Sequence, residues 1–367
     1  MKTRTICCKL LTTPAISSVL KETSERFSDA CNYVLEVAIR EKTHNAIQLH
    51  HLCYAEVRKR FGLSANLAVR SIRRVVSCMT KLKGTRKRPK VFKPKSIDYD
   101  ARIFSYRQAD ESVSLTTIKG RIRIPMILGE HQRKALIGKS PTCATVINKC
   151  GIWYIHIVVD FVAEPFDGDG IMGIDLGINN IATTSTGTMI EGESRQIYKE
   201  KRHAIRASLQ SKNTKGSKNL LNRLANKESR RIQHENHVIS KSIVKEAIRH
   251  NCGVIRMERL KHIRSRTKTW NKHRNRMIAG WSFYQLQQFV QYKAEGLGLS
   301  VEFIDPSYTS LTCHRCFQLG SRNGERFNCT TCGISHADVN ASHVIALGGA
   351  SVNTPELGVF TPKSPRL

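Results

Sequence analysis

The chain has 367 residues and carries 60 Lys and Arg against 29 Asp and Glu, so its formal net charge is +31. This length allows two or three domains and a sizeable core. The charge favours a polyanionic partner; a solvated basic surface or a ribosome-associated protein is the plainer alternative. No stretch approaches the ~18 apolar residues that a membrane-spanning helix needs, so we expect no membrane partner.

The first part of the chain shows a strand pattern followed by helical periodicity. Residues 1–12 alternate like a strand, and helical periodicity begins at about Ser17. Further helices are expected over 51–61 and 64–81. From 103 to 162 the pattern changes to short strands separated by turn residues, as in a small β-barrel or sandwich. The simplest account is a β-domain that carries a helical insertion.

A basic segment over 81–95 separates the helices from the later strands. It contains eight Lys and Arg and no acidic residue, and its glycine and prolines mark a loop. A disordered linker is one interpretation, and a loop that contacts phosphates is at least as well supported. The residues that we expect to contact nucleic acid here are Arg86, Lys87, Arg88 and Lys90.

The remainder of the chain reads as strands and helices in the order of an RNase H-like domain. Three short antiparallel strands, a long basic helical region, a strand, a helix, a strand and a final helix are expected in turn. Their approximate ranges are 171–175, 181–186, 188–190, 196–250, 254–258, 281–295, 301–304 and 337–347. A central sheet of this kind brings distant strand ends together.

Three acidic residues occupy matching positions in this pattern. Asp175 and Glu258 each end an apolar strand-like run, and Asp338 opens the last helix. Alone, each has an ordinary explanation as a turn former, a solvated acid or a partner of the helix dipole. Together they predict a site where carboxylate oxygens bind two Mg²⁺ or Mn²⁺ ions for phosphodiester hydrolysis.

Four of the twelve cysteines form two CxxC pairs. Cys313 and Cys316 are followed by a spacer of twelve residues and then by Cys329 and Cys332. This spacing is typical of a zinc ribbon, in which four thiolates hold a structural Zn²⁺ and leave no open coordination position. We expect the nearby His314 to be an ordinary surface residue.

The other eight cysteines show no framework spacing, which fits free thiols in a reducing compartment, here the cytoplasm or nucleoid. These residues are Cys7, Cys8, Cys31, Cys53, Cys78, Cys143, Cys150 and Cys252.

A second basic loop, 261–276, follows Glu258 directly and contains seven Lys and Arg and no acid. A basic loop with an embedded aromatic residue suits a nucleic-acid backbone with one stacked base; a solvated loop is the alternative. The residues expected to contact nucleic acid here are Arg264, Arg266, Lys268, Trp270, Lys272 and Arg274.

The stretch from about 171 to 347 resembles the TnpB family, the RNA-guided DNA nucleases of insertion sequences related to type V CRISPR nucleases. Gly173-Ile-Asp175-Leu-Gly177 matches the first RuvC motif, Ile255-Arg-Met-Glu258 the second, and Asp338-Val-Asn340 the third. Residues 1–165 fit the family only in layout. Phe317 stands where the family usually has Gly, and Arg259 where an acid is common.

The resemblance implies an α/β and β multidomain fold: an RNase H-like (RuvC) nuclease domain with an inserted zinc ribbon, preceded by a wedge-like β-barrel with a helical insertion. The corresponding ranges are 1–15 and 91–165 for the wedge-like β-barrel, 16–90 for the helical recognition domain, 166–308 and 336–347 for the nuclease domain, 309–335 for the zinc ribbon and 348–367 for a disordered tail.

It also implies a function: a transposon-encoded, Mg²⁺-dependent endodeoxyribonuclease that uses a guide RNA and cuts double-stranded DNA beside a short target-adjacent motif. Asp175, Glu258 and Asp338 would be catalytic. The alternatives are a compact type V CRISPR-like effector, a guided DNA-binding protein without cleavage, and a transposase. The oligomeric state is open between a monomer with RNA and a dimer.

Overall fold

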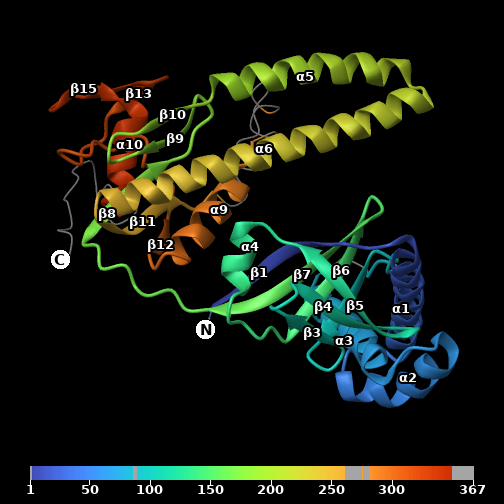
Figure 1. Cartoon of the computed structure of the whole chain (residues 1–367). Helices are drawn as coiled ribbons and strands as arrows, with labels where there is room; N and C mark the ends of the chain where they lie inside the picture. The colour runs from blue at the N-terminus through green and yellow to red at the C-terminus, as the bar shows by residue number, and fades with distance from the viewer. Residues whose placement is uncertain (1, 86–88, 261–274, 276–280, 349–367) are drawn as a thin grey trace. The chain divides into compact units, whose positions relative to one another are not determined.

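The computed structural model describes residues 2–85, 89–260, 275 and 281–348 (Figure 1). The chain divides into two compact units, Met1–Val162 and Ala163–Leu367, and each is described by itself. The finer partition expected from the sequence stays a prediction. Among the described helices, none combines the length and the apolar character that a bilayer crossing requires.

The first unit is built on a seven-stranded sheet that curls into a nearly closed barrel. Its strand order is β2-β6-β7-β1-β5-β4-β3, with antiparallel neighbours throughout. The strands are β1 (Lys2–Leu10), β2 (Ser96–Asp100), β3 (Phe104–Arg107), β4 (Ser112–Thr117), β5 (Gly120–Ile127), β6 (Cys143–Lys149) and β7 (Ile152–Phe161).

Three helices lie between β1 and β2, as the helical insertion predicts, and a short helix lies between β5 and β6. They are α1 (Pro14–Arg40), α2 (Ala46–Phe61), α3 (Ala65–Leu82) and α4 (Glu130–Leu136). The α1 helix begins at a Thr13 N-cap whose side chain accepts from the Ile16 amide. The α2 helix ends at Gly62, in the left-handed conformation (φ +63°) that glycine adopts without strain.

The core of this unit joins the helices to the barrel. Trp153 alternates inward on β7 and donates through its indole Nε1 to the Ser17 hydroxyl of α1, at 2.9 Å. Phe27 of α1 is fully buried in the same cluster. Arg74 of α3 pairs with Asp98 of β2 at 2.6 Å. Buried apolar side chains and one largely buried ion pair therefore hold the helices against the sheet.

The second unit contains a five-stranded mixed sheet with the order β10-β9-β8-β11-β12. The strands are β8 (Gly170–Asp175), β9 (Asn180–Thr184), β10 (Met189–Glu191), β11 (Cys252–Glu258) and β12 (Ser300–Ile304). β11 lies parallel to both β8 and β12, whereas β8, β9 and β10 are antiparallel. This is the sheet that the RNase H-like pattern predicts.

The helices of this unit are α5 (Glu193–Lys212), α6 (Lys215–Arg249), α9 (Phe283–Glu295) and α10 (Ala337–Ala346). The helical region expected over 196–250 is therefore two antiparallel helices rather than one (Figure 1). The break has a local cause. Asn213 adopts the left-handed conformation that ends α5, and the Thr214 hydroxyl caps α6 by accepting from the Ser217 amide at 3.1 Å.

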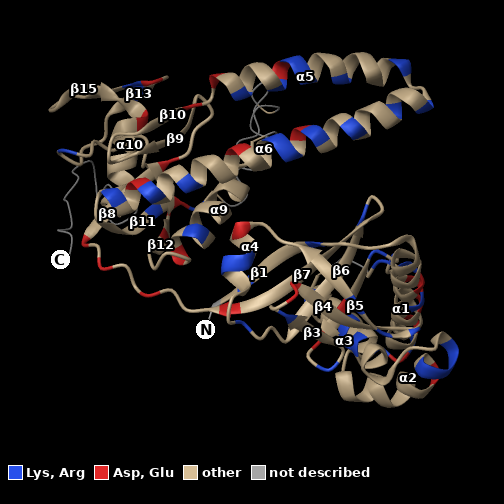
Figure 2. Ribbon diagram, in the orientation of Figure 1, with Lys and Arg blue, Asp and Glu red and all other residues tan. Residues whose placement is uncertain are grey.

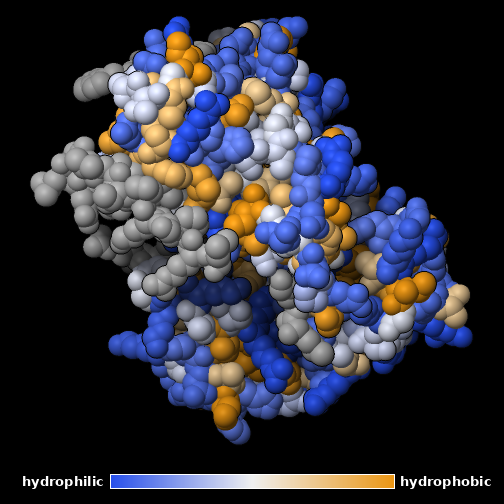
Figure 3. Space-filling view, turned by 90° about the vertical axis from the view of Figure 1, so that its left-hand side faces the viewer, coloured by the Kyte–Doolittle hydropathy of each residue, from blue (hydrophilic) through white to orange (hydrophobic). Residues whose placement is uncertain are grey.

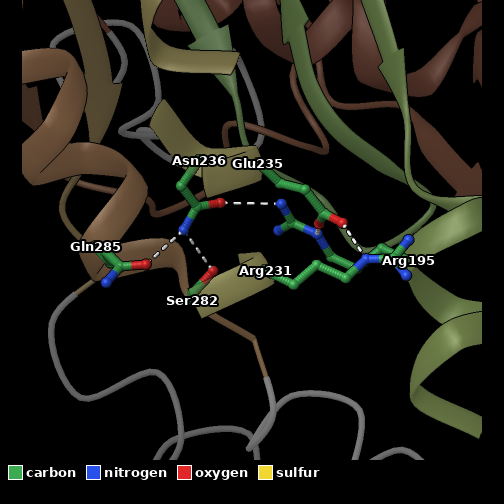
Figure 4. A network of polar contacts seen from close by, with 6 residues as sticks. All are labelled: Arg195, Arg231, Glu235, Asn236, Ser282 and Gln285. Carbon is green, nitrogen blue, oxygen red and sulfur yellow. Dashed lines mark hydrogen bonds and ion pairs between the residues drawn. The ribbon is translucent and has the colours of Figure 1, made fainter. Parts of the chain in front are cut away.

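A buried polar network joins α5, α6 and the start of α9 (Figure 4). Arg195 donates to Glu235 at 2.9 Å and to the Asn236 side-chain oxygen at 3.0 Å. The Asn236 amide nitrogen donates to Ser282 Oγ at 2.8 Å and to Gln285 Oε1 at 2.9 Å. Asn236 is fully buried, and its partners satisfy both ends of its amide.

Beyond this network, the α5–α6 pair carries many Lys and Arg residues along its length (Figure 2). On the face of the protein shown in Figure 3, hydrophobic residues stand in small groups among hydrophilic ones. A surface of this kind suits a polyanionic partner better than an apolar one.

The last helix packs against the first strand of the sheet at Gly173. A Cβ atom there would overlap backbone atoms of Ser342 and Ala346. Residue 173 must therefore be glycine for α10 to lie this close to β8. The packing matters for the site described below, because β8 and α10 each carry one of the three acids.

Replacing Gly173 by alanine should push α10 away from β8 and destabilise the second unit by about 1–3 kcal/mol, because overpacking of a tight contact forces backbone shifts. Scanning calorimetry measures the change as a lower melting temperature. Gly216→Ala is the matched control, since its added Cβ meets no other atom closer than 4.0 Å in the first turn of α6. Equal stability of Gly173→Ala and the wild-type chain would contradict the close approach.

Candidate metal centre and zinc ribbon

Two of the three acids lie side by side at one edge of the second unit's sheet. Asp175 is the last residue of β8 and Glu258 the last residue of β11. These strands are parallel and pair Ile174 with Met257, so their carboxyl ends reach the same edge in register. An apolar run that ends in an acid at the end of a parallel strand therefore places its carboxylate beside that of the neighbouring strand.

The third acid reaches the same place from α10. Asp338 is the second residue of this helix and is 5% exposed. Asn180, at the start of β9, donates to its Oδ2 at 2.8 Å, and Arg322 of β13 (Ser321–Asn323) donates to its Oδ1 at 2.6 Å. Both carboxylate oxygens are thus held by donors from different elements, which fixes the orientation of the carboxylate.

Glu258 is held in a similar way. The buried Thr309 hydroxyl donates to its Oε1. Gln287 of α9 donates to the Glu258 backbone carbonyl at 2.6 Å. The Thr309 hydroxyl also lies 3.1 Å from the Pro306 carbonyl, so it contacts the turn before the ribbon as well as an acid of the site.

The pKa values of Asp175 and Glu258 are both raised. Burial raises the pKa of Asp175 to about 8, and the charges of Glu258 and Asp338 add to that rise, while Arg322 opposes it. Burial also raises the pKa of Glu258, against the hydrogen bond from Thr309. Burial disfavours the charged form of a carboxylate, and the hydrogen bonds donated to it offset this only in part. Nearby positive charge is therefore needed for full ionisation.

This arrangement offers a chemically suitable place for hard divalent cations. Carboxylate oxygens are the ligands that Mg²⁺ and Mn²⁺ prefer. The three carboxylates do not already lie close enough to share one ion among the described residues, so a bound cation would have to draw them together. Since burial and neighbouring negative charge raise the pKa of Asp175 to about 8, a cation bound there would favour its ionised form.

The four cysteines of the expected zinc ribbon also converge. Their sulfur atoms all lie within 4.8 Å of one another, and this is the sole His, Cys, Asp and Glu cluster of at least three that fits a metal ion among the described residues. Cys329 ends β14 (Arg326–Cys329), and Cys332 lies in the turn before β15 (Gly333–His336). Cys313 and Cys316 precede β13. The cluster fits a structural Zn²⁺ held by four thiolates.

The electrostatics of the cysteines agree with a cation-binding role. Burial raises the pKa of the Cys329 thiol, but hydrogen bonds from the Cys332 and Thr331 amides and from neighbouring thiols outweigh it and bring the pKa to about 7. Burial raises the pKa of Cys316 to about 12, with its thiol neighbours adding to the rise. The Cys329 thiol therefore ionises readily, whereas Cys316 and Cys332, whose pKa values are raised, require a metal to do so.

Two expectations about the ribbon need comment. His314 is not an ordinary surface residue, because its ring lies 2.8 Å from Asn340 Oδ1 and stacks on His343 with centroids 4.8 Å apart. Phe317, which directly follows the first CxxC pair, adopts the left-handed conformation, with φ +62°. A glycine at this position would adopt this conformation without strain, whereas phenylalanine does so at some cost.

The basic residues expected to contact nucleic acid fall mostly outside the described residues. The predicted contact residues that lie outside the described residues, eight of them basic and one aromatic, are Arg86, Lys87, Arg88, Arg264, Arg266, Lys268, Trp270, Lys272 and Arg274. Lys90 is described and is exposed.

Sequence reasoning missed three residues at the carboxylate site: Asn180, Thr309 and Arg322. Each reaches an acid that is distant in the sequence, by 158, 51 and 16 positions respectively. The only sequence signal for the position of Asn180 was the turn Gly177-x-x-Asn180, which closely follows Asp175 and returns the chain toward the acids. No local pattern singles out Thr309 or Arg322.

Two family models match the second unit. One, described as "Probable transposase", matches residues 161–264, which include Asp175 and Glu258. The other, described as "Cas12f1-like, TNB domain", matches residues 283–345, which include the four cysteines and Asp338.

Named relatives agree with these matches. The chain is 29% identical over 242 residues to a TnpB-like protein of Methanocaldococcus jannaschii, which covers 62% of this chain and 86% of the relative. It is 33% identical over 217 residues to the CRISPR-associated endodeoxyribonuclease Cas12f1 of Sulfoacidibacillus thermotolerans. That alignment covers 53% of this chain, and it spans only 50% of the Cas12f1 relative.

A solved structure has the same fold. The protein titled as the Cas12f1-sgRNA-target DNA complex aligns with a TM-score of 0.64 and 16% identity, over 91% of this chain and 83% of that chain. The predicted fold class, a β-barrel with a helical insertion and an RNase H-like unit with a cysteine ribbon, is thereby confirmed. The matched parts of the chain are therefore similar to TnpB-like proteins and to Cas12f1.

Replacing Asp175 by asparagine should stabilise the metal-free chain at neutral pH. Its pKa is about 8 in the folded state against 3.8 ordinarily, so the folded state holds a proton that the unfolded state releases. The wild-type chain therefore loses stability as the pH rises from about 4 toward 8, and Asp175→Asn lacks this loss. In chelator, its melting temperature should exceed the wild-type value by several degrees at pH 7.5, with the gap closing toward pH 4.5.

The control for that comparison is Asp167→Asn, which removes an exposed carboxylate from the same unit. A stability gap that is independent of pH would count against the raised pKa of Asp175.

Replacing Cys329 by serine should abolish zinc binding, because Cys329 supplies the most acidic thiol of the cluster. Mass spectrometry of the native protein is expected to find one zinc per wild-type chain and none in the variant. Cys143→Ser, at an exposed free thiol of the first unit, should keep its zinc. A full zinc content in Cys329→Ser would remove Cys329 from the ligand set.

Proposed function

We propose that the chain is an RNA-guided DNA endonuclease that hydrolyses phosphodiester bonds at Asp175, Glu258 and Asp338. The observation that carries this proposal is that the fold brings these three acids to one sheet edge, where burial, with the charges of Glu258 and Asp338 adding to it, raises the pKa of Asp175 to about 8. The similarity to TnpB-like proteins and the endodeoxyribonuclease named among the relatives support the same class of reaction.

In this mechanism the carboxylates bind Mg²⁺ or Mn²⁺ at the scissile phosphate. Two such ions, when bound, activate the attacking water and stabilise the leaving 3′ oxygen. Asn180 and Arg322 hold the two oxygens of Asp338, and Thr309 holds Glu258, so the ligands keep one geometry as the phosphate approaches. Zn²⁺ in the ribbon has a structural role in this proposal, because four thiolates fill its coordination sphere.

We assign a guide RNA and double-stranded DNA as partners. The net charge of +31 supports a polyanionic partner, and the structural neighbour is titled as a complex with sgRNA and target DNA. The basic residues of 86–90 and 264–274 are proposed to contact nucleic acid. The division into a wedge-like barrel, a helical recognition domain, a nuclease domain and a zinc ribbon is also a proposal.

The test begins with the chain expressed together with its flanking genomic DNA, so that any guide RNA made there can bind. The bound RNA is sequenced, and the complex is incubated with Mg²⁺ and a plasmid library randomised beside a guide-matched target. Linear product that depends on both the guide match and a short adjacent motif supports the proposal. Protein without bound RNA that still cuts would instead indicate a nuclease or transposase that finds DNA by itself.

Asp175→Ala in the same complex should lower the cleavage rate by roughly 10⁴-fold, as expected for loss of an essential group, while RNA and DNA binding survive. Cleavage is followed on a gel and binding by mobility shift. Asp167→Ala, an exposed acid nearby in the sequence, serves as the control. Cutting by Asp175→Ala at the wild-type rate would refute the assignment of the site.

A further inference from the structure

Asn340 is a fully buried amide that lies two residues after Asp338 in the first turns of α10. A buried amide is stable only when its donors and acceptor are paired, so its partners report what it holds. All the partners of the Asn340 side chain lie in the zinc ribbon.

These partners flank the first cysteine ligand on both sides. The Asn340 amide nitrogen donates to the Thr312 carbonyl at 2.6 Å. Its oxygen accepts from the His314 backbone amide at 3.0 Å and lies 2.8 Å from His314 Nδ1. One side chain therefore bridges α10 to the peptide groups before and after Cys313.

The ribbon also contacts the neighbouring turn of α10. The Ala337 amide donates to the Glu325 carbonyl at 2.7 Å, and Arg322 pairs with Asp338 at 2.6 Å. The other half of the helix rests on β8 at Gly173. The turn that carries Asp338 is thus held by the ribbon as well as by Asn180 of β9, whereas the rest of the helix rests on the sheet.

The ribbon has little core of its own. Its buried apolar cluster consists of Cys313, Phe327, Cys329 and Ala337, and two of these four are expected zinc ligands. Such a small module is held mainly by its metal. If the zinc leaves, the Thr312–His314 backbone is no longer fixed, and the Asn340 amide loses the partners that set the turn.

We propose that Asn340 is a positioning residue that makes the divalent-metal affinity of the Asp175, Glu258 and Asp338 site depend on zinc in the ribbon. The proposal rests on the proposed function, since it assumes that these carboxylates bind Mg²⁺ or Mn²⁺. Asn340 touches neither metal nor substrate; it acts through the position of Asp338. Loss of such supporting contacts typically weakens metal binding 10- to 100-fold.

The plainer reading is that Asn340 stabilises the fold and nothing more. Asn236 provides the matched control for this reading, because it is also fully buried, has three side-chain partners and lies in the same unit (Figure 4). Its partners belong to α5, α9 and the residue that caps α9, and none belongs to the ribbon. Asn236→Ala therefore removes a similar amide without touching the link from ribbon to α10.

The experiment measures binding of Mn²⁺ alone to the full chain by electron paramagnetic resonance, with zinc counted by mass spectrometry. Asn340→Ala should bind Mn²⁺ at least 10-fold more weakly than the wild-type chain. Asn236→Ala should lower the melting temperature comparably but keep the wild-type Mn²⁺ affinity. Equal Mn²⁺ affinity in Asn340→Ala and the wild-type chain would overturn the proposal.

A second arm uses the wild-type chain, in case Asn340→Ala does not fold. Zinc is removed by titrating the cysteines with an organomercurial, and Mn²⁺ binding is measured again. The same weakening of 10-fold or more is expected, and unchanged affinity after zinc loss would overturn the coupling. Asp175→Ala separates this outcome from failure of the proposed function: if wild-type Mn²⁺ binding is insensitive to Asp175→Ala, the carboxylate site itself is wrong.

Discussion

The second unit depends on keeping three carboxylates, one buried and two partly buried, at one edge of its sheet. Parallel pairing of β8 and β11 brings Asp175 and Glu258 to one edge, and α10 adds Asp338. Burial, with the charges of Glu258 and Asp338 adding to it, raises the pKa of Asp175 to about 8. A protein optimised only for stability would not retain such a cluster, so its cost is best explained by a role in binding cations.

The elements around the cluster can be understood as supports for it. Asn180 comes from β9, Thr309 from the segment after β12, and Arg322 from the ribbon, and each directs a donor at a carboxylate oxygen. Arg322 also lowers the pKa of both Asp175 and Glu258, so it offsets part of the repulsion without removing it. The partial compensation leaves room for divalent cations to complete it.

Much of this could be predicted from the sequence, because some signals are local. The apolar runs that end in Asp175 and Glu258 revealed both strand ends, and the two CxxC pairs revealed the ribbon. The partners of the acids could not be predicted in this way. Thr309 and Arg322 resemble ordinary surface residues until the fold brings them to Glu258 and Asp338, and only tertiary packing decides that.

The place of the ribbon in the chain follows from the same constraint. It stands between β12 and α10, and Cys332 precedes Asp338 by only six residues. A module so close in sequence cannot move far without moving the acid, particularly since Asn340 and the Ala337 amide also bind it. A ribbon that served only to grip nucleic acid could have been placed in any surface loop. Its attachment to the turn that carries Asp338 is therefore better explained if the ribbon also sets the geometry of the carboxylates.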